Sequence, residues 1–124
     1  QTEVYSMNNY SKISLSENGR TELHDALSLT GAEISVNSLP AGASVPFVHV
    51  HRQNEEIYAV LEGKGKAEID GESIEIKAGD WVRIAPKAKR RFFAADDEGI
   101  KYICIQVKEN SLGGYSMADA EIAQ

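Results

Sequence analysis

The chain has 124 residues, which fits one domain, and its hydrophobic share of 42% can supply a core. The formal net charge is −6 and the sequence pI is about 5.0, so nucleic acid would on average be repelled and we expect no nucleic-acid partner. No apolar run approaches the roughly 20 residues that a membrane-spanning helix needs, so we expect no membrane span.

The single cysteine, Cys104, excludes a disulfide within the chain and suits a reducing compartment. Residues 1–11 are polar and show no signal-peptide pattern. Both features favour a cytoplasmic location. Cys104 lies within the apolar run Tyr102–Ile105, so we expect it to be a small buried hydrophobic side chain rather than a nucleophile.

The pattern along the chain is dominated by short strand-like runs with Gly, Pro, Asn or Asp between them. The first patterned segment, Thr21–Leu29, has weak helical character and is ambiguous. The tail Met117–Ala123 is compatible with one turn of helix. Between them, eight strands are predicted, over Ala32–Leu39, Phe47–His51, Glu56–Leu61, Gly65–Ile69, Ser73–Ile76, Trp81–Ala85, Arg91–Ala94 and Ile100–Val107.

A hairpin is predicted where Asp70-Gly71 separates the alternating runs Lys66–Ile69 and Glu72–Ile76. A two-residue turn of this kind needs positive φ angles, which Asp-Gly tolerates. Eight closely spaced strands without a long helical period predict an all-β sandwich or barrel. We therefore expect a single domain over residues 1–124, with the barrel body at about residues 32–107.

Two of the predicted strands, Glu56–Leu61 and Ile100–Val107, are apolar on both faces. A barrel wall in contact with water would show polar alternation, so something must cover the outer face. A second subunit in a two-fold homodimer is one candidate, and the terminal segments folding over the barrel are the other. The residues assigned to the outer face are Ile57, Ala59, Leu61, Ile103, Ile105 and Val107.

One stretch of the chain has the residue types of a metal site. His49 and His51 are separated by one residue and are followed by Glu56. Side chains alternate in an extended strand, so the two imidazoles point the same way. Two imidazoles and a carboxylate are three of the ligands that a divalent transition metal takes.

The spacing around these ligands resembles the first motif of the cupin superfamily. Gly42, His49-x-His51, Glu56 and Gly63 follow one another with six, four and six residues between them. The chain also resembles the small single-domain cupins of bacteria. The resemblance implies a jelly-roll β-barrel of two antiparallel sheets with a metal inside the barrel.

The second cupin motif departs from the family pattern. It begins with Gly and continues to Pro, Gly, His and often Asn, and this chain offers Gly79–Pro86 for its first part. Counted from Pro86, the usual Gly, His and Asn positions are Ala88, Arg91 and Ala95. Arg91 cannot ligate a metal, because its guanidinium stays protonated and has no acceptor. We expect its side chain to enter the barrel beside the three remaining ligands.

Three interpretations remain open. In the first, His49, His51 and Glu56 hold a divalent metal (Zn, Mn, Ni or Fe), and Arg91 clamps a carboxylate or phosphate of a small ligand. The protein would then be an oxygenase, isomerase or lyase acting on a small polar molecule. In the second, the metal is lost, Arg91 pairs with Glu56, and the pocket binds or senses an organic anion without chemistry. In the third, nothing binds, and the cluster is a satisfied polar remnant.

Three further side chains are candidates for ligand binding in the same pocket. Tyr58 shares the strand face of Glu56, and Phe47 shares that of His49. Phe93 has the parity expected of an inward position on its own strand. For each of them, packing within the barrel is the alternative role.

Overall fold

The computed structural model describes residues 3–6, 9–15, 19–115 and 119–123. The regular secondary structure of the described chain is almost entirely strand, with a single helical turn, which confirms the all-β prediction. Among the described residues, no helix is long and apolar enough to cross a membrane. In chain order the elements are β1 (Glu3–Ser6), β2 (Ser11–Ser14), β3 (Arg20–Glu22), α1 (His24–Leu27), β4 (Glu33–Leu39), β5 (Asn54–Ile69), β6 (Glu72–Lys77), β7 (Trp81–Ile84), β8 (Arg90–Ala94) and β9 (Ile100–Lys108).

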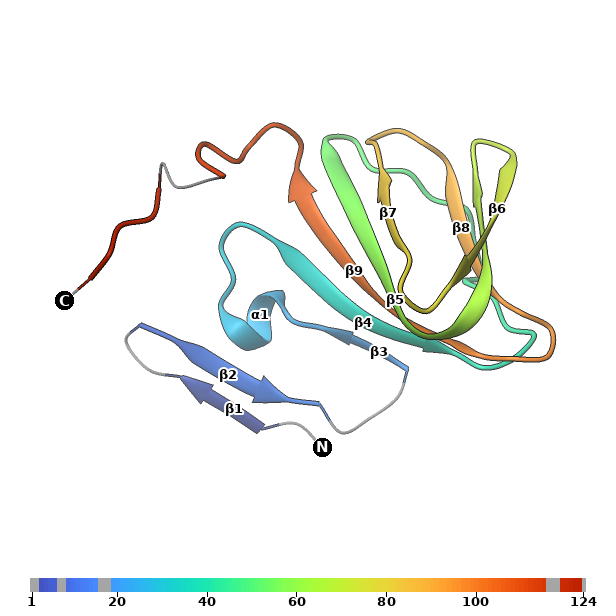
Figure 1. Cartoon of the computed structure of the whole chain (residues 1–124), viewed down its shortest axis with the longest axis horizontal. Helices are drawn as coiled ribbons and strands as arrows, with labels where there is room; N and C mark the ends of the chain where they lie inside the picture. The colour runs from blue at the N-terminus through green and yellow to red at the C-terminus, as the bar shows by residue number, and fades with distance from the viewer. Residues whose placement is uncertain (1–2, 7–8, 16–18, 116–118, 124) are drawn as a thin grey trace.

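The long strand β5 joins the two antiparallel walls of a jelly-roll barrel (Figure 1). Its first part, residues 54–63, pairs with β9 and β7, and β9 in turn pairs with β4 and β4 with β3. Its second part, residues 64–69, pairs with β6 and β8. The change of wall coincides with a bulge between Val60 and Glu62 and with Gly63 at φ 78°.

The predicted hairpin is present between β5 and β6. Ile69 pairs with Glu72, and Asp70 and Gly71 between them have φ angles of 51° and 84°. Both residues are thus in the left-handed region that the two-residue turn requires.

Some predicted elements differ from the structure. The two strands expected on either side of Gly63 are one continuous strand, β5. The strand expected over Phe47–His51 is wrong, since this stretch forms only an isolated bridge between His49 and Arg90. The ambiguous segment Thr21–Leu29 holds the end of β3 and the four-residue helix α1. The helical turn predicted for Met117–Ala123 begins outside the described residues, and residues 119–123 contain no helix.

The inward residues of the barrel form one core that ends in an aromatic layer. The ring centroids of Tyr58 and Phe92 are 4.1 Å apart, and those of Phe92 and Tyr102 are 5.3 Å apart. Stacked rings of this kind bury a large apolar area at the base of the polar site described below. The buried core residues are Tyr58, Val60, Ala67, Ile76, Ile84, Phe92, Ala94, Ile100, Tyr102 and Cys104.

The terminal segments lie to one side of the barrel in Figure 1. β1 and β2 pair with each other in a sheet separate from the barrel walls. This hairpin packs against α1, and the Ser11 hydroxyl donates to the Leu27 carbonyl at 2.7 Å.

Candidate metal centre

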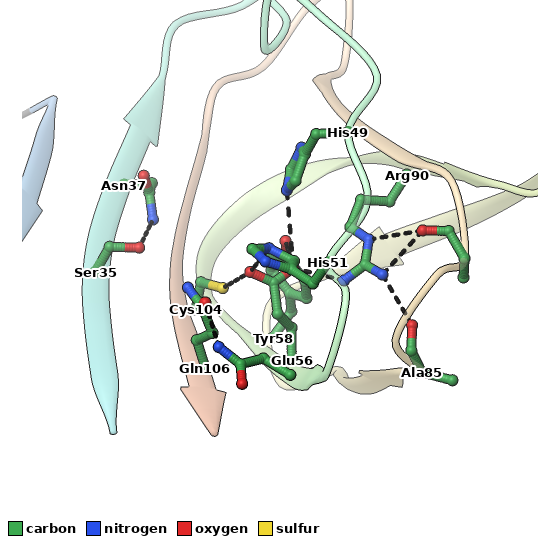
Figure 2. A network of polar contacts seen from close by, with 12 residues as sticks. Ser35, Asn37, His49, His51, Glu56, Tyr58, Ala85, Arg90, Cys104 and Gln106 are labelled. Carbon is green, nitrogen blue, oxygen red and sulfur yellow. Dashed lines mark hydrogen bonds and ion pairs between the residues drawn. The ribbon is translucent and has the colours of Figure 1, made fainter. Parts of the chain in front are cut away.

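His49, His51 and Glu56 converge inside the barrel (Figure 2). His49 and His51 come from the irregular segment before β5, and Glu56 is the third residue of β5. One potential ligand atom from each residue lies within 4.8 Å of the others. The two imidazole rings meet edge to face, with centroids 5.2 Å apart. The structure therefore brings together the three residues that the sequence motif selected.

The ring nitrogens at this site are short of hydrogen-bond partners. His49 Nδ1 and His51 Nε2 are buried and have none among the described residues. His51 Nε2 lies 2.9 Å from Glu56 Oε2, but the contact lacks the geometry of a hydrogen bond. A buried polar atom without a partner is costly. His49 Nε2, 3.9 Å from Glu56 Oε1, and the unpartnered His51 Nε2 face the carboxylate together, and this donor set fits a divalent transition metal.

The carboxylate of Glu56 is held by three donors. Its Oε1 accepts a hydrogen bond from the Tyr58 hydroxyl at 2.7 Å and another from Arg90 Nη1 at 2.7 Å, and its Oε2 accepts from Cys104 Sγ at 3.3 Å. Burial by itself would raise the pKa of Glu56, but the hydrogen bonds from Tyr58 and Arg90 and the nearby His51 outweigh it. The pKa of Glu56 therefore lies below its usual value, and the group is an anion fixed in orientation.

Arg90 is the residue that the sequence reasoning missed. Its side chain is fully buried and pairs with Glu56, and Arg90 Nη2 also donates to the Ala85 and Ala88 carbonyls at 2.8 and 2.9 Å. Arg90 faces His49 in a backbone bridge, so both side chains lie on the same face. Alternation along the strand did not identify Arg90, because residues 90–95 come in like pairs. Whichever member of each pair is assigned to the inner face, that face carries one arginine, one phenylalanine and one alanine.

The prediction that Arg91 enters the barrel is wrong. Arg91 Nε donates to the Val45 carbonyl at 2.8 Å, and Arg91 Nη2 donates to Ser44 Oγ at 3.1 Å. The guanidinium of Arg91 also lies 4.9 Å from the centre of the Phe93 ring. The register counted from Pro86 was therefore off by one residue: Arg90, not Arg91, faces His49.

The inward position and the ligand-binding role predicted for Phe93 are also wrong, because Phe93 lies on the same outer face as Arg91. Lys66 and Arg91 cover its ring, and it does not line the cavity beside the metal cluster. The second interpretation had paired Arg91 with Glu56. The ion pair with Glu56 exists, but Arg90 makes it.

A cavity of about 590 Å³ opens beside the three candidate ligands. Tyr58 and Phe47 line it, as predicted, and Phe47 is 62% exposed with its ring edge-on to His49. Sequence reasoning did not select the opposite wall, because its residues lie far from the motif along the chain. The lining residues on that side include Arg20, Glu33, Ser35 and Asn37 before the motif and Gln106 after it.

The pKa shifts of the titratable groups in the cavity favour metal ligation by His49 and disfavour nucleophilic attack by Tyr58 or Cys104. Burial lowers the pKa of His49, which favours the neutral imidazole that binds metals. Burial raises the pKa of Tyr58, so its hydroxyl stays a donor to Glu56. Burial, with the nearby charge of Glu56, raises the pKa of Cys104 to about 12. Cys104 is therefore a buried neutral thiol, as the sequence indicated.

Comparison with known proteins places this geometry in a family. The family model described as the cupin domain matches residues 36–106. An uncharacterized protein of Methanocaldococcus jannaschii is 34% identical over 86 residues, which cover 69% of this chain and 64% of that protein. An uncharacterized protein of Aquifex aeolicus is 36% identical over 50 residues, which cover 40% of each chain. The chain thus spans less than two thirds of the length of these curated relatives.

Solved structures agree with the family match. A cupin protein from Bacteroides fragilis is 59% identical, with a TM-score of 0.92 over 95% of this chain and 100% of that one. A predicted oxalate decarboxylase from Thermotoga maritima is 25% identical, with a TM-score of 0.57 over 60% of this chain and 64% of that one. A putative sugar phosphate isomerase from Acidithiobacillus ferrooxidans is 26% identical, with a TM-score of 0.62 over 72% of this chain and 58% of that one. By its sequence match, its barrel and its residue spacing, the chain belongs to the cupin family.

Proposed function

We propose that this cupin binds a divalent transition metal through His49, His51 and Glu56 and takes a small anionic or polar ligand into the adjoining cavity. One observation carries the proposal. His51 Nε2 is buried without a described hydrogen-bond partner 2.9 Å from Glu56 Oε2, and His49 Nε2 lies 3.9 Å from Glu56 Oε1, so one nitrogen of each ring faces the oriented carboxylate. A metal ion satisfies all three groups at once.

The chain's own residues perform three tasks in this proposal. Arg90 and Tyr58 fix the carboxylate of Glu56, which keeps it charged and correctly turned. The aromatic layer closes the base of the cavity, and Phe47 lies at its exposed side. A metal held by His49, His51 and Glu56 would supply Lewis-acid chemistry toward an oxygen-bearing ligand in the adjoining cavity.

The reaction class is a second step of the proposal. Two structural neighbours are described as a predicted oxalate decarboxylase and a putative sugar phosphate isomerase. Both names fit a lyase or an isomerase acting on a small oxygen-rich molecule, and an oxygenase would use the same ligand set with iron. Zinc, manganese, nickel and iron are the metals that such a donor set accepts.

A metal-free anion binder is the second candidate, and the Arg90–Glu56 pair favours it. This buried ion pair at 2.7 Å already neutralises the only carboxylate of the metal cluster. The cavity could then recognise an anion through its other donors without any metal. Metal content separates the two candidates.

The test is metal analysis of protein purified without chelator or nickel affinity, after growth with all four metals supplied. We expect near-stoichiometric metal in the wild type and a small fraction of it in His51→Ala, with an unchanged circular-dichroism spectrum. His24→Ala is the matched control, because His24 is exposed and pairs with Asp25 on α1. Metal-free wild-type protein under these conditions would overturn the metal proposal in favour of the anion binder.

A further inference from the structure

The cavity wall across β9 from the metal cluster is polar and ordered. Ser35 and Asn37 on β4 are only 3% and 6% exposed, and Arg20 on β3 reaches both of them. Arg20 Nη1 donates to Asn37 Oδ1 at 2.9 Å and to Ser35 Oγ at 3.3 Å, and Asn37 Nδ2 donates to Ser35 Oγ at 2.9 Å. Figure 2 shows Ser35 and Asn37 on the strand beyond β9. These three residues are called the donor wall below.

In the donor wall, the side-chain oxygens of Ser35 and Asn37 already accept hydrogen bonds, whereas some N–H and O–H groups have no acceptor among the described residues. Asn37 Oδ1 accepts from Arg20, and Ser35 Oγ accepts from both neighbours. Within the described chain, no acceptor takes the Ser35 hydroxyl proton or the second amide proton of Asn37. Buried donors without acceptors are costly, so the wall is complementary to a ligand that carries acceptors. Glu22 pairs with Arg20 Nη2 at 3.3 Å, but this pair is exposed at the rim.

Gln106 extends the same property toward the metal cluster. Its Oε1 accepts from Asn54 Nδ2 at 2.7 Å, which leaves its amide protons without a described acceptor. Gln106 lines the cavity and pairs in register with Glu56 on the neighbouring strand. Donors therefore continue from the donor wall to the edge of the candidate metal centre.

The charges around the cavity leave room for an anion once a metal is bound. The lining residues Arg20, Glu33 and Glu56, together with the buried Arg90, carry charges that sum to zero when the histidines are neutral, and Glu22, which pairs with Arg20 at the rim, brings the sum to −1. A divalent ion then leaves one positive charge without compensation. Positive charges in a partly enclosed site repel each other unless an anion lies between them.

The geometry gives the length of that anion. β4 and β5 flank β9, and Glu33 is the β4 residue in line with Glu56, while Ser35 and Asn37 lie two and four residues farther along β4. Two strand spacings with these offsets put the backbones of Ser35 and Asn37 roughly 12 and 17 Å from that of Glu56. Side chains and a metal occupy part of this span. What remains suits a chain of four or five carbon atoms with an acceptor group at each end, and a volume of about 590 Å³ accommodates it.

We propose that the donor wall of Arg20, Ser35 and Asn37 recognises the distal carboxylate of a small dicarboxylic acid, whose other carboxylate faces His49, His51 and Glu56. The contact of the second carboxylate with the metal cluster rests on the proposed function. Recognition of the distal carboxylate requires only the donor wall. Arg20 is the specificity-determining residue, because its guanidinium supplies the positive charge; both Nη1 protons are used by Asn37 and Ser35 and one Nη2 proton by Glu22, which leaves Nε and the other Nη2 proton as the planar pair for a carboxylate.

The test compares two ligands of equal carbon number by isothermal titration calorimetry. Succinate carries both carboxylates, and butyrate lacks the distal one. With Zn²⁺-loaded wild type, we expect succinate to bind at least about tenfold more tightly than butyrate. Arg20→Gln should abolish this preference while its zinc content stays at the wild-type level. Arg83→Gln is the matched control, since Arg83 lies on the outside of the barrel and pairs there with Glu55 and Glu109.

The outcomes separate this proposal from the metal proposal. Absence of succinate binding by the wild type, or an unchanged preference in Arg20→Gln, would overturn the donor wall while leaving the metal result intact. If the wild type binds no metal, the same succinate and butyrate titrations on metal-free protein measure the contribution of the donor wall alone. A preference for succinate that depends on Arg20 is expected there as well, and its absence rejects the wall.

Discussion

Arg90 is the residue on which the geometry of the candidate metal centre depends. A fully buried guanidinium is tolerated only when its donors and its charge are satisfied. Glu56 supplies the opposite charge, and the Ala85 and Ala88 carbonyls accept the other hydrogen bonds. One side chain thus links the metal cluster to the turn that precedes β8. The same side chain places a positive charge directly beside the carboxylate of the metal cluster.

Replacing Arg90 by histidine should lower the unfolding free energy of the metal-free protein and raise its affinity for zinc. In Arg90→His the buried charge pair is lost, and we expect the metal-free protein to lose about 3–5 kcal/mol of unfolding free energy. The new imidazole faces His49 across the bridge, so zinc affinity should rise about tenfold or more. Urea unfolding with and without Zn²⁺ and a competitive zinc titration measure the two effects.

Arg91→His is the control for this substitution, because Arg91 lies on the outer face of the same strand. It should leave zinc affinity unchanged and cost about 1 kcal/mol for its lost hydrogen bonds. Equal effects of the two variants on zinc affinity would show that Arg90 does not face the metal cluster.

At the scale of elements, the bend in β5 at Gly63 shapes the barrel. Gly63 has φ 78°, and a Cβ there would lie 1.9 Å from the Gly99 carbonyl oxygen. Gly65, two residues on, meets the Phe93 carbonyl oxygen in the same way at 2.0 Å. Strand β5 therefore crosses from one wall to the other only where side chains are absent. Glu56 lies on the first wall, seven residues before the point at which β5 changes walls at Gly63.

Gly63→Ala should destabilise the protein far more than a positive φ alone explains. We expect a loss of about 3–5 kcal/mol in urea unfolding, because the new methyl group overlaps backbone that cannot move freely. Gly79→Ala is the matched control, since Gly79 has φ 96° and nothing within 4 Å of its Cβ position. It should cost only about 1–2 kcal/mol. Similar losses in the two variants would contradict the proposed close approach of the chains.

At the scale of the whole molecule, the outer face of the β4–β9–β5–β7 wall is apolar. Val36, Ile103, Ala59 and Trp81 pair in register across these four strands. A second row of Ile34, Ile105 and Ile57 follows beside it and ends in the charged Arg83 on β7. Trp81 is 70% exposed and Leu61 46% exposed. Soluble monomers seldom expose a continuous apolar face of this kind.

We propose that this face is the interface of a two-fold homodimer, because self-association buries it most simply. Sedimentation at micromolar concentration should then give about twice the chain mass of 13.6 kDa. Trp81→Glu should shift the protein to monomer with little effect on folding, since the side chain is exposed. Tyr115→Glu is the control, because Tyr115 is 86% exposed and lies outside this face. A wild-type monomer under these conditions would exclude the dimer.

Local features of the sequence determined the fold class and the candidate metal centre. The hairpin at Asp70-Gly71 follows from the φ angles that these residues tolerate. His49, His51 and Glu56 were selected by their residue types and because their spacing, with Gly42 and Gly63, resembles the first cupin motif. The strand expected to align the two imidazoles does not form, and backbone hydrogen bonds to Arg90 and Lys87 hold the histidine segment in place.

Only the tertiary structure decided which arginine enters the barrel and what faces the metal cluster. Arg90 rather than Arg91 points inward because Arg90 pairs with His49, a contact between residues about forty positions apart that alternation within β8 cannot reveal. The donor wall likewise exists because β3 pairs with β4, which brings Arg20 to Ser35 and Asn37. Register between distant strands is set by the packing of the whole barrel, and a shift of one residue reverses every side chain.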